Sequence, residues 1–239
     1  VFDYQSYWST MIQPQGKDFR YEELCFRWYE ALRHLGLNVD FIRPGASLEG
    51  YPLVVVPCMT EVTEAARAEL EKAKGVVVIG ARTGSRDRNF RIPENLPPGP
   101  LGSLTGNRVI QVSSLRPGLS DGVSGAVSGH AIRWREYVET SASVLATFDN
   151  GDPALTEKGN VLYLACWADA GLLAEVLELA TKKAGVVTLR VPDFIRIRRR
   201  GDLVFAFNYG TDDWVLPEGA EAVLGERVLK PQAVAAWRA

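Results

Sequence analysis

The sequence has few of the residues on which several protein classes depend. Its 239 residues include three cysteines, Cys25, Cys58 and Cys166, and two histidines. Thiols so few and so widely spaced predict neither a disulfide framework nor a zinc site, and they favour a reducing, cytoplasmic setting. No apolar run approaches the roughly 20 residues that a membrane-spanning helix needs. A net charge of −2 gives no reason to expect binding to nucleic acid or to an anionic membrane.

The first residues carry no processing signal. Residues 1–4 include no initiator methionine, no basic segment and no apolar signal segment. We interpret them as a strand entered partway along, and we expect further chain upstream. With 46% hydrophobic and 23% charged residues, the composition is that of a globular protein with one large domain or two modest ones.

Helix and strand patterns alternate along the first 186 residues. Apolar residues at Leu24, Trp28, Leu32 and Leu35 share one face of a helix that we expect to end at Gly36. The same reasoning predicts strands over 37–42, 53–57, 75–80, 108–115, 134–139, 144–148 and 161–167, and helices over 64–74 (capped by Thr63) and 169–184. This order predicts an α/β fold, an open parallel sheet with flanking helices.

Two regions depart from that alternation. Residues 82–107 contain several prolines and glycines and predict a long loop, of the kind that is functional or contacts a partner. From 187 onward only strand patterns recur, at 194–200, 203–209 and 233–237. We therefore expect an α/β domain over 1–186 and a small all-β domain over 187–239 that is too small to be stable alone.

Paired catalytic carboxylates are not apparent in the sequence. A glycosidase needs two of them about 5 to 9.5 Å apart, usually at the ends of barrel strands. The chain has too few β/α units for an eightfold barrel, which takes roughly 200 residues or more. Most acidic residues fall on predicted helix surfaces or in turns, where a solvated charge is the expected role: Glu22, Glu23, Glu64, Glu69, Glu71, Asp212 and Asp213.

The most suggestive local motif is the segment 80–84, with sequence Gly-Ala-Arg-Thr-Gly, directly after a predicted buried strand. A sharp turn between two glycines after a strand is the geometry of a nucleophile elbow. Its central residue is Arg82, which stays protonated and cannot attack a substrate. We expect His34 to lie on a helix and His130 in a loop without a carboxylate partner. A turn that needs small residues is therefore the favoured interpretation.

Other candidate sites are equally weak. The glycines do not form a phosphate-binding motif, and the Arg198–Arg200 triple favours the end of a hairpin or a cluster of salt bridges over an anion site. Trp8, Trp134 and Trp167 are able to stack on sugar rings, but packing is the commoner use of tryptophan. We thus predict no catalytic, cofactor-binding or metal-binding residue in this chain.

Segments along nearly the whole chain resemble, in order, family-42 glycoside hydrolases, the bacterial β-galactosidases. The segment 90–101, Phe-Arg-Ile-Pro-Glu-Asn-Leu-Pro-Pro-Gly-Pro-Leu, is the most specific of them. The other matching segments are 12–19, 51–57, 80–85, 114–118, 134–136, 199–202 and 207–209.

The resemblance implies a division of labour. Such enzymes carry a (β/α)8 barrel with both catalytic glutamates, which act by a retaining mechanism on terminal β-linked galactose. The barrel is followed by a trimerisation domain similar to class I glutamine amidotransferases and by a small β domain. This chain matches the second and third parts, so no catalytic glutamate carries over. We expect a homotrimer, joined to its own upstream barrel that binds the galactoside, with no cofactor.

Two interpretations of other kinds stay open at this point. One is a stand-alone amidotransferase-like hydrolase that uses Cys58 or Cys166. The other is a carbohydrate-binding module that uses exposed tryptophans. For the assembly role, the loops 13–19 and 82–107 are our candidates for contacts between subunits.

Overall fold

The structure is a computed structural model that describes residues 1–238, and the chain divides into two compact units. Unit 1 contains Val1–Trp28 and Phe41–Val186, and unit 2 contains Tyr29–Asp40 and Val187–Ala239. The boundary between the units at 186/187 lies where the predicted helices end and only strand patterns continue. The segment 29–40, however, belongs to the C-terminal unit. As functional domains, 1–186 and 187–239 remain a prediction. Within residues 1–238 no helix is both long and apolar enough to cross a bilayer.

Unit 1 is built on a sheet that has nine strands within the described residues, in the order β1-β2-β8-β7-β6-β4-β5-β3, with β9 paired to β5. The strands are β1 (Leu53–Val56), β2 (Val76–Gly80), β3 (Asn107–Ser114), β4 (Ser120–Gly125), β5 (Gly129–Thr140), β6 (Ser143–Phe148), β7 (Pro153–Lys158), β8 (Val161–Leu164) and β9 (Cys166–Ala168). The helices are α1 (Tyr4–Ile12), α2 (Tyr21–His34), α3 (Glu64–Lys72), α4 (Gly102–Thr105) and α5 (Ala170–Lys183), with a 3₁₀ turn η1 (Gly99–Leu101).

The predicted α/β class is confirmed, and the sheet is mixed. Only β1, β2 and β8 are parallel, and the remaining pairs are antiparallel. The strands β4 to β8 follow one another through connections too short for the helical crossover that parallel pairing requires. The strands β4 and β7 were missed by the sequence prediction because their segments contain glycine or begin at proline, which weaken a strand signal.

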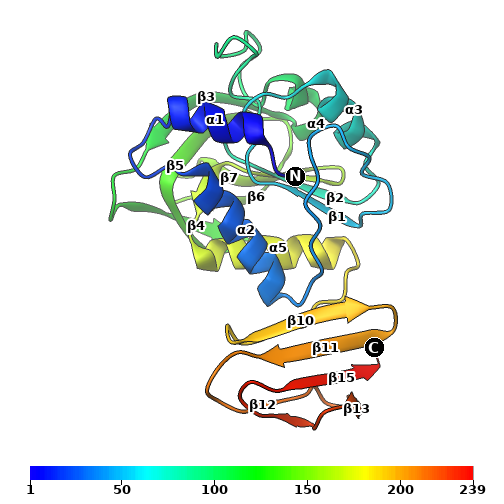
Figure 1. Cartoon of the computed structure of the whole chain (residues 1–239). Helices are drawn as coiled ribbons and strands as arrows, with labels where there is room; N and C mark the ends of the chain where they lie inside the picture. The colour runs from blue at the N-terminus through cyan, green and yellow to red at the C-terminus, as the bar shows by residue number, and fades with distance from the viewer. Residues whose placement is uncertain (239) are drawn as a thin grey trace. The chain divides into compact units, whose positions relative to one another are not determined.

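Helices cover both faces of the sheet. Val77 and Ile79 of β2 pack with Leu70 of α3 and Leu101 in one core cluster. Successive strand residues point to opposite faces, so Val78 faces the other way, and α5 packs on β2 and β5 there. Figure 1 shows α5 (yellow-green) on the other side of the sheet from α3 and α4. All five residues of β2 are buried, as expected for a strand covered on both faces.

Residues 1–4 are not a strand, in contrast to the expectation. Helix α1 begins at Tyr4, and the carboxylate of Asp3 accepts the N–H groups of Gln5 (3.1 Å) and Ser6 (3.0 Å), which makes Asp3 its N-cap. The segment 37–42 is not a strand either. It alternates apolar and polar residues, but no described strand pairs with it, so the segment stays irregular.

Unit 2 contains two small antiparallel sheets. One has the order β10 (Ile195–Arg200), β11 (Leu203–Asn208), β15 (Val234–Arg238) and β13 (Ala222–Leu224), and the other pairs β12 (Trp214–Val215) with β14 (Val228–Leu229). The guanidinium of Arg33 donates to the carbonyl of Ile197, and the Leu189 N–H donates to the Leu35 carbonyl (2.9 Å). These bonds explain why residues 29–40 belong to this unit.

Candidate functional site

The turn after β2 has the geometry of an elbow, and Arg82 stands at its tip. Arg82 has φ 65°, a left-handed conformation that is uncommon for a residue other than glycine. Its side chain is 2% exposed. The turn is closed by the Gly84 N–H, which donates to the Met59 carbonyl (2.8 Å), and by Thr83 Oγ1, which accepts the Met59 N–H (3.2 Å). The segment thus keeps the shape of a nucleophile elbow with an arginine in the central position.

The Arg82 guanidinium is fully enclosed by the chain. Its two Nη atoms donate to the backbone carbonyls of Pro14 (2.9 Å) and Gln13 (3.0 Å). The guanidinium carbon lies 4.2 Å from the ring centre of Phe19 and 5.0 Å from that of Trp134, in cation–π range. Burial lowers the pKa of Arg82 from its ordinary value. The side chain therefore fixes the loop 13–19 over the end of the sheet.

A buried carboxyl group lies beneath this turn. Glu136 on β5 is 1% exposed, and its Oε1 accepts the backbone N–H of Arg82 (2.8 Å) and the indole N–H of Trp134 (3.4 Å). Its Oε2 accepts the hydroxyl of Tyr163 (2.5 Å). Burial raises the pKa of Glu136, although these three donors and the nearby Arg82 act in the opposite direction. Both carboxyl oxygens are engaged within the protein, which leaves neither free for a substrate.

Sequence reasoning missed the role of Glu136. Acidic residues are mostly surface residues, and Glu22, Glu64 and Glu71 are indeed exposed, each beside an arginine. The available signal was the position of Glu136 between buried Trp134 and Val138 in a strand, since alternate residues share a face.

Helix α1 closes the rest of this edge of the sheet. The Oγ of Ser6 accepts the N–H of Thr60 (2.7 Å), which follows β1. The crevice beyond the carboxyl ends of parallel strands is the usual ligand site of open α/β sheets. Here α1, the loop 13–19 and Arg82 occupy it. We call this region the filled edge.

The cysteines do not support a thiol hydrolase. Cys25, Cys58 and Cys166 are buried and free. Burial raises the pKa of the Cys25 thiol to about 11 and that of Cys58 and Cys166 further, so none is poised to form a thiolate. The structure thus argues against the interpretation of a stand-alone hydrolase that uses Cys58 or Cys166.

Both histidines lie near a carboxylate. The prediction that His130 lacks such a partner was wrong, because its Nδ1 lies 3.3 Å from Asp169 Oδ2. Asp169 also caps α5 by accepting the Leu172 N–H (2.8 Å), which gives the pair a structural role at a helix terminus. His34 ends α2, as expected for a residue on a helix, and lies 3.7 Å from Asp193.

All of the remaining sequence candidates except Trp8 have structural roles. Trp134 and Trp167 are each 3% exposed and cannot stack on a sugar, whereas Trp8 is 54% exposed. Arg198–Arg200 ends the strand β10 at the hairpin to β11, as expected. Within residues 1–238 no group of three or more histidine, cysteine, aspartate or glutamate residues is arranged to hold a metal ion.

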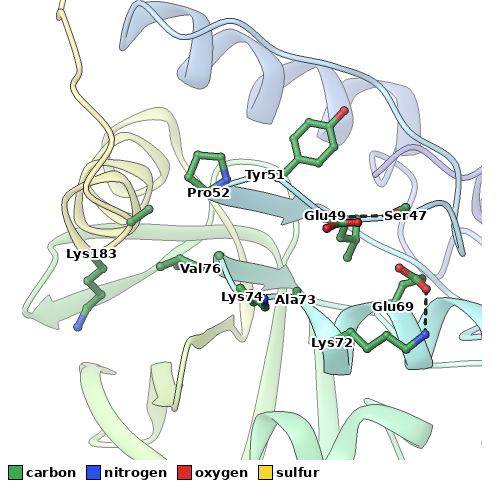
Figure 2. A pocket seen from close by; sticks show the side chains of 14 residues that line it. Ser47, Glu49, Tyr51, Pro52, Glu69, Lys72, Ala73, Lys74, Val76 and Lys183 are labelled. Carbon is green, nitrogen blue, oxygen red and sulfur yellow. Dashed lines mark hydrogen bonds and ion pairs between the residues drawn. The ribbon is translucent and has the colours of Figure 1, made fainter.

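A hollow lies at the opposite, amino-terminal edge of the parallel strands. Its cavity volume is about 740 Å³. Figure 2 shows that its lining comes from the loop before β1, the connection from α3 to β2 and the end of α5. Two of its lysines are already paired, Lys72 with Glu69 (3.3 Å) and Lys183 with Glu157 (2.7 Å). We call this region the open edge.

Comparison with known proteins gives consistent matches. A family model described as the β-galactosidase trimerisation domain matches residues 1–187. The chain is 43% identical to a β-galactosidase of Thermus thermophilus over 99% of this chain and 37% of the relative. It is 42% identical, with the same coverage, to a β-galactosidase of a Thermus species.

Solved structures agree. The β-galactosidase of the psychrophilic Marinomonas ef1 superimposes with a TM-score of 0.95 at 39% identity, over 99% of this chain and 36% of that one. The β-galactosidase of Halorubrum lacusprofundi gives 0.92 at 32% identity, over 100% of this chain and 39% of that one. The chain therefore spans little more than a third of the length of the relatives it matches.

Proposed function

Because the chain belongs to the β-galactosidase trimerisation-domain family, we propose that it is the assembly part of a longer family-42 β-galactosidase. The observation that carries the proposal is the family match over residues 1–187. In this proposal two further copies of the chain and a (β/α)8 barrel of the same polypeptide are its partners. The barrel supplies both catalytic glutamates and binds the galactoside, and the enzyme works in the cytoplasm.

The filled edge supports a role other than catalysis. In a hydrolase with a nucleophile elbow, the nucleophile occupies the tip of the turn and a nearby base accepts its proton. In this chain Arg82 occupies the tip, and the carboxyl group beneath it accepts three hydrogen bonds from the protein itself. A buried arginine and carboxyl group in such a network contribute rigidity, which suits a domain that has to present fixed surfaces to other subunits.

The experiment separates assembly from catalysis. The 239-residue chain and the longer polypeptide are purified, and their molar masses are measured by light scattering after size-exclusion chromatography. Hydrolysis of a chromogenic β-galactoside is measured in parallel. We expect trimers of the longer polypeptide with galactosidase activity, and no activity in the 239-residue chain. A longer polypeptide that is monomeric at every concentration would contradict the assembly role, and hydrolysis by the chain alone would contradict the division of labour.

A further inference from the structure

Helix α1 has its apolar side turned outward. Its buried residues are Ser6, Ser9 and Thr10, all polar. Four apolar residues are exposed instead, at spacings of four, seven and eight positions that place them on one helical face: Tyr4 (65% exposed), Trp8 (54%), Met11 (64%) and Ile12 (67%). We call these four residues the α1 face. A surface helix of a monomeric protein normally has the reverse arrangement, with its apolar stripe toward the core.

The α1 face has the composition of an interface centre. No charged residue occurs between Tyr4 and Gly16. Depletion of charge together with tyrosine, tryptophan and methionine distinguishes the centre of a protein–protein contact from ordinary surface. The aromatic surface also continues beyond the helix, because the ring of Phe2 lies 5.2 Å from that of Tyr4 and 6.4 Å from that of Phe41, which is exposed.

The underside of α1 is held firmly. Asp3 caps the helix, and Ser6 accepts the N–H of Thr60 (2.7 Å). Thr10 donates to the carbonyl of Ser6 (2.8 Å), and the carbonyl of Gln13, which ends the helix, accepts from Arg82 (3.0 Å). A helix fixed in this way loses little conformational freedom on binding, which favours affinity. The polar residues of α1 thus hold it in place, and its apolar residues are left for a partner.

We propose that the α1 face is a contact surface between copies of this chain, with a second copy as its occupant. The inference rests on the proposed function, because the family model that includes α1 describes a trimerisation domain. In a ring of three subunits each copy contributes two different surfaces to its two neighbours. The α1 face is one of these surfaces, and Trp8, Met11 and Ile12 are the side chains that lose water on contact.

The first test is a double variant, Trp8→Lys with Ile12→Lys, made in the 239-residue chain and in the longer polypeptide. Both residues are exposed, so the fold should persist, and an unchanged circular dichroism melt of the chain diluted below its assembly range checks this. Leu119→Lys is the matched control, because Leu119 is 58% exposed in a turn elsewhere on unit 1. Light scattering over a dilution series gives the concentration at which each trimer dissociates.

We expect the double variant to dissociate at a concentration roughly 100-fold or more above that of the unmodified protein, since buried aromatic anchors dominate interfaces. Leu119→Lys should dissociate as the unmodified protein does. If the unmodified protein is trimeric and the double variant dissociates no earlier than Leu119→Lys, the inference fails and the proposed function stands. If the unmodified longer polypeptide never forms trimers, the proposed function itself fails.

Fluorescence gives an independent measurement. The buried tryptophans Trp28, Trp134, Trp167 and Trp237 are at most 5% exposed, so acrylamide quenching reports chiefly on Trp8 and the half-buried Trp214. The difference in quenching between the unmodified protein and a Trp8→Phe variant is the contribution of Trp8. We expect this contribution to be small in the trimer and to rise on dilution as subunits separate. Full quenching of Trp8 in the intact trimer would overturn the inference.

Discussion

The filled edge and the open edge of unit 1 lie at opposite ends of the same parallel strands, and they differ in burial: the first is packed with protein groups, and the second is a hollow. Beyond the carboxyl ends of β1 and β2, the buried Arg82 and Glu136 form a polar network that the loop 13–19 covers with its backbone carbonyls. Beyond the amino ends lies a hollow of about 740 Å³, where the exposed Lys72 pairs with the partly exposed Glu69. Open α/β sheets usually bind ligands at the carboxyl edge. In this chain that edge has become part of the core, so substitutions there should act on stability.

Replacing Arg82 should have the largest effect. Arg82→Ala leaves the carbonyls of Gln13 and Pro14 without their donors and opens a cavity between Phe19 and Trp134. Loss of one member of a buried charged network typically costs about 3–5 kcal/mol. Urea denaturation measures the change in the free energy of unfolding. Arg86→Ala, two residues beyond this turn and half-buried, is the control and should cost about 1 kcal/mol or less. Equal losses for the two arginines would remove the distinction between core and surface on this edge.

Two glycines with positive φ provide a matched pair across the edges. A Cβ on Gly84 (φ 66°) would lie 2.0 Å from the Pro98 carbonyl oxygen, whereas a Cβ on Gly50 (φ 84°), which lines the hollow, meets nothing within 4 Å. Gly50→Ala should cost only the backbone strain of about 1–2 kcal/mol. Gly84→Ala should cost about 2 kcal/mol more, because backbone atoms must also move. Thermal and urea melts of both variants would contradict this comparison if Gly50→Ala were the more damaging.

The pH dependence of stability should identify Glu136. Burial raises its pKa in the folded chain above the value of about 4.3 in the unfolded chain. Its contribution therefore favours the fold below that pH and is lost as the pH rises through the folded pKa. Relative to Glu136→Gln, the wild-type free energy of unfolding should fall as the pH rises above about 4.3, by about 1.4 kcal/mol for each unit by which the folded pKa is raised. Parallel curves for the two proteins would contradict the assignment, and Glu139→Gln, an exposed carboxylate on the same strand, is the control.

The open edge should give the smallest effect. Lys72 is exposed and pairs with Glu69 one helical turn away (3.3 Å). Exposed pairs of this kind contribute on the order of 0.5 kcal/mol, and salt screens them. Lys72→Ala should therefore change the free energy of unfolding by about 0.5 kcal/mol or less in low salt and by less still in 1 M NaCl. A loss above about 2 kcal/mol would show that the hollow is a structural element comparable to the filled edge.

The sequence alone predicted the parallel strands and the helices α3 and α5, whose N-cap residues directly precede them in the chain. Thr63 and Asp169 each precede an apolar periodic segment, and both are N-caps. Helix α1 escaped prediction because its apolar residues face outward, so the pattern that usually marks a core face marks a surface here. The segment 37–42 shows the converse. Its alternation is real, but a strand also needs a neighbour, and pairing over long sequence separations leaves no local signal.

The filled edge was only partly predictable. The turn at 80–84 follows from its glycines and the strand before it, and the elbow shape is confirmed by the φ of Arg82. That Arg82 is buried follows instead from Phe19 and Trp134, which are 63 and 52 positions away along the chain and meet it only in the folded protein. Glu136 and Tyr163 likewise come together through the pairing of separate strands.

The membership of residues 29–40 in unit 2 has a consequence for how the protein is made. The Arg33 guanidinium donates a hydrogen bond to the carbonyl of Ile197, a residue that is synthesised 164 positions later in the chain. At a synthesis rate of 5–20 residues per second, about 10 to 30 s pass before the ribosome supplies that partner. During this interval the end of α2 has no strand to pack against. Its residues that are buried in the folded protein remain exposed, and chaperones are able to bind them. Slow steps in the biogenesis of this protein should therefore concentrate at the completion of the C-terminal sheet.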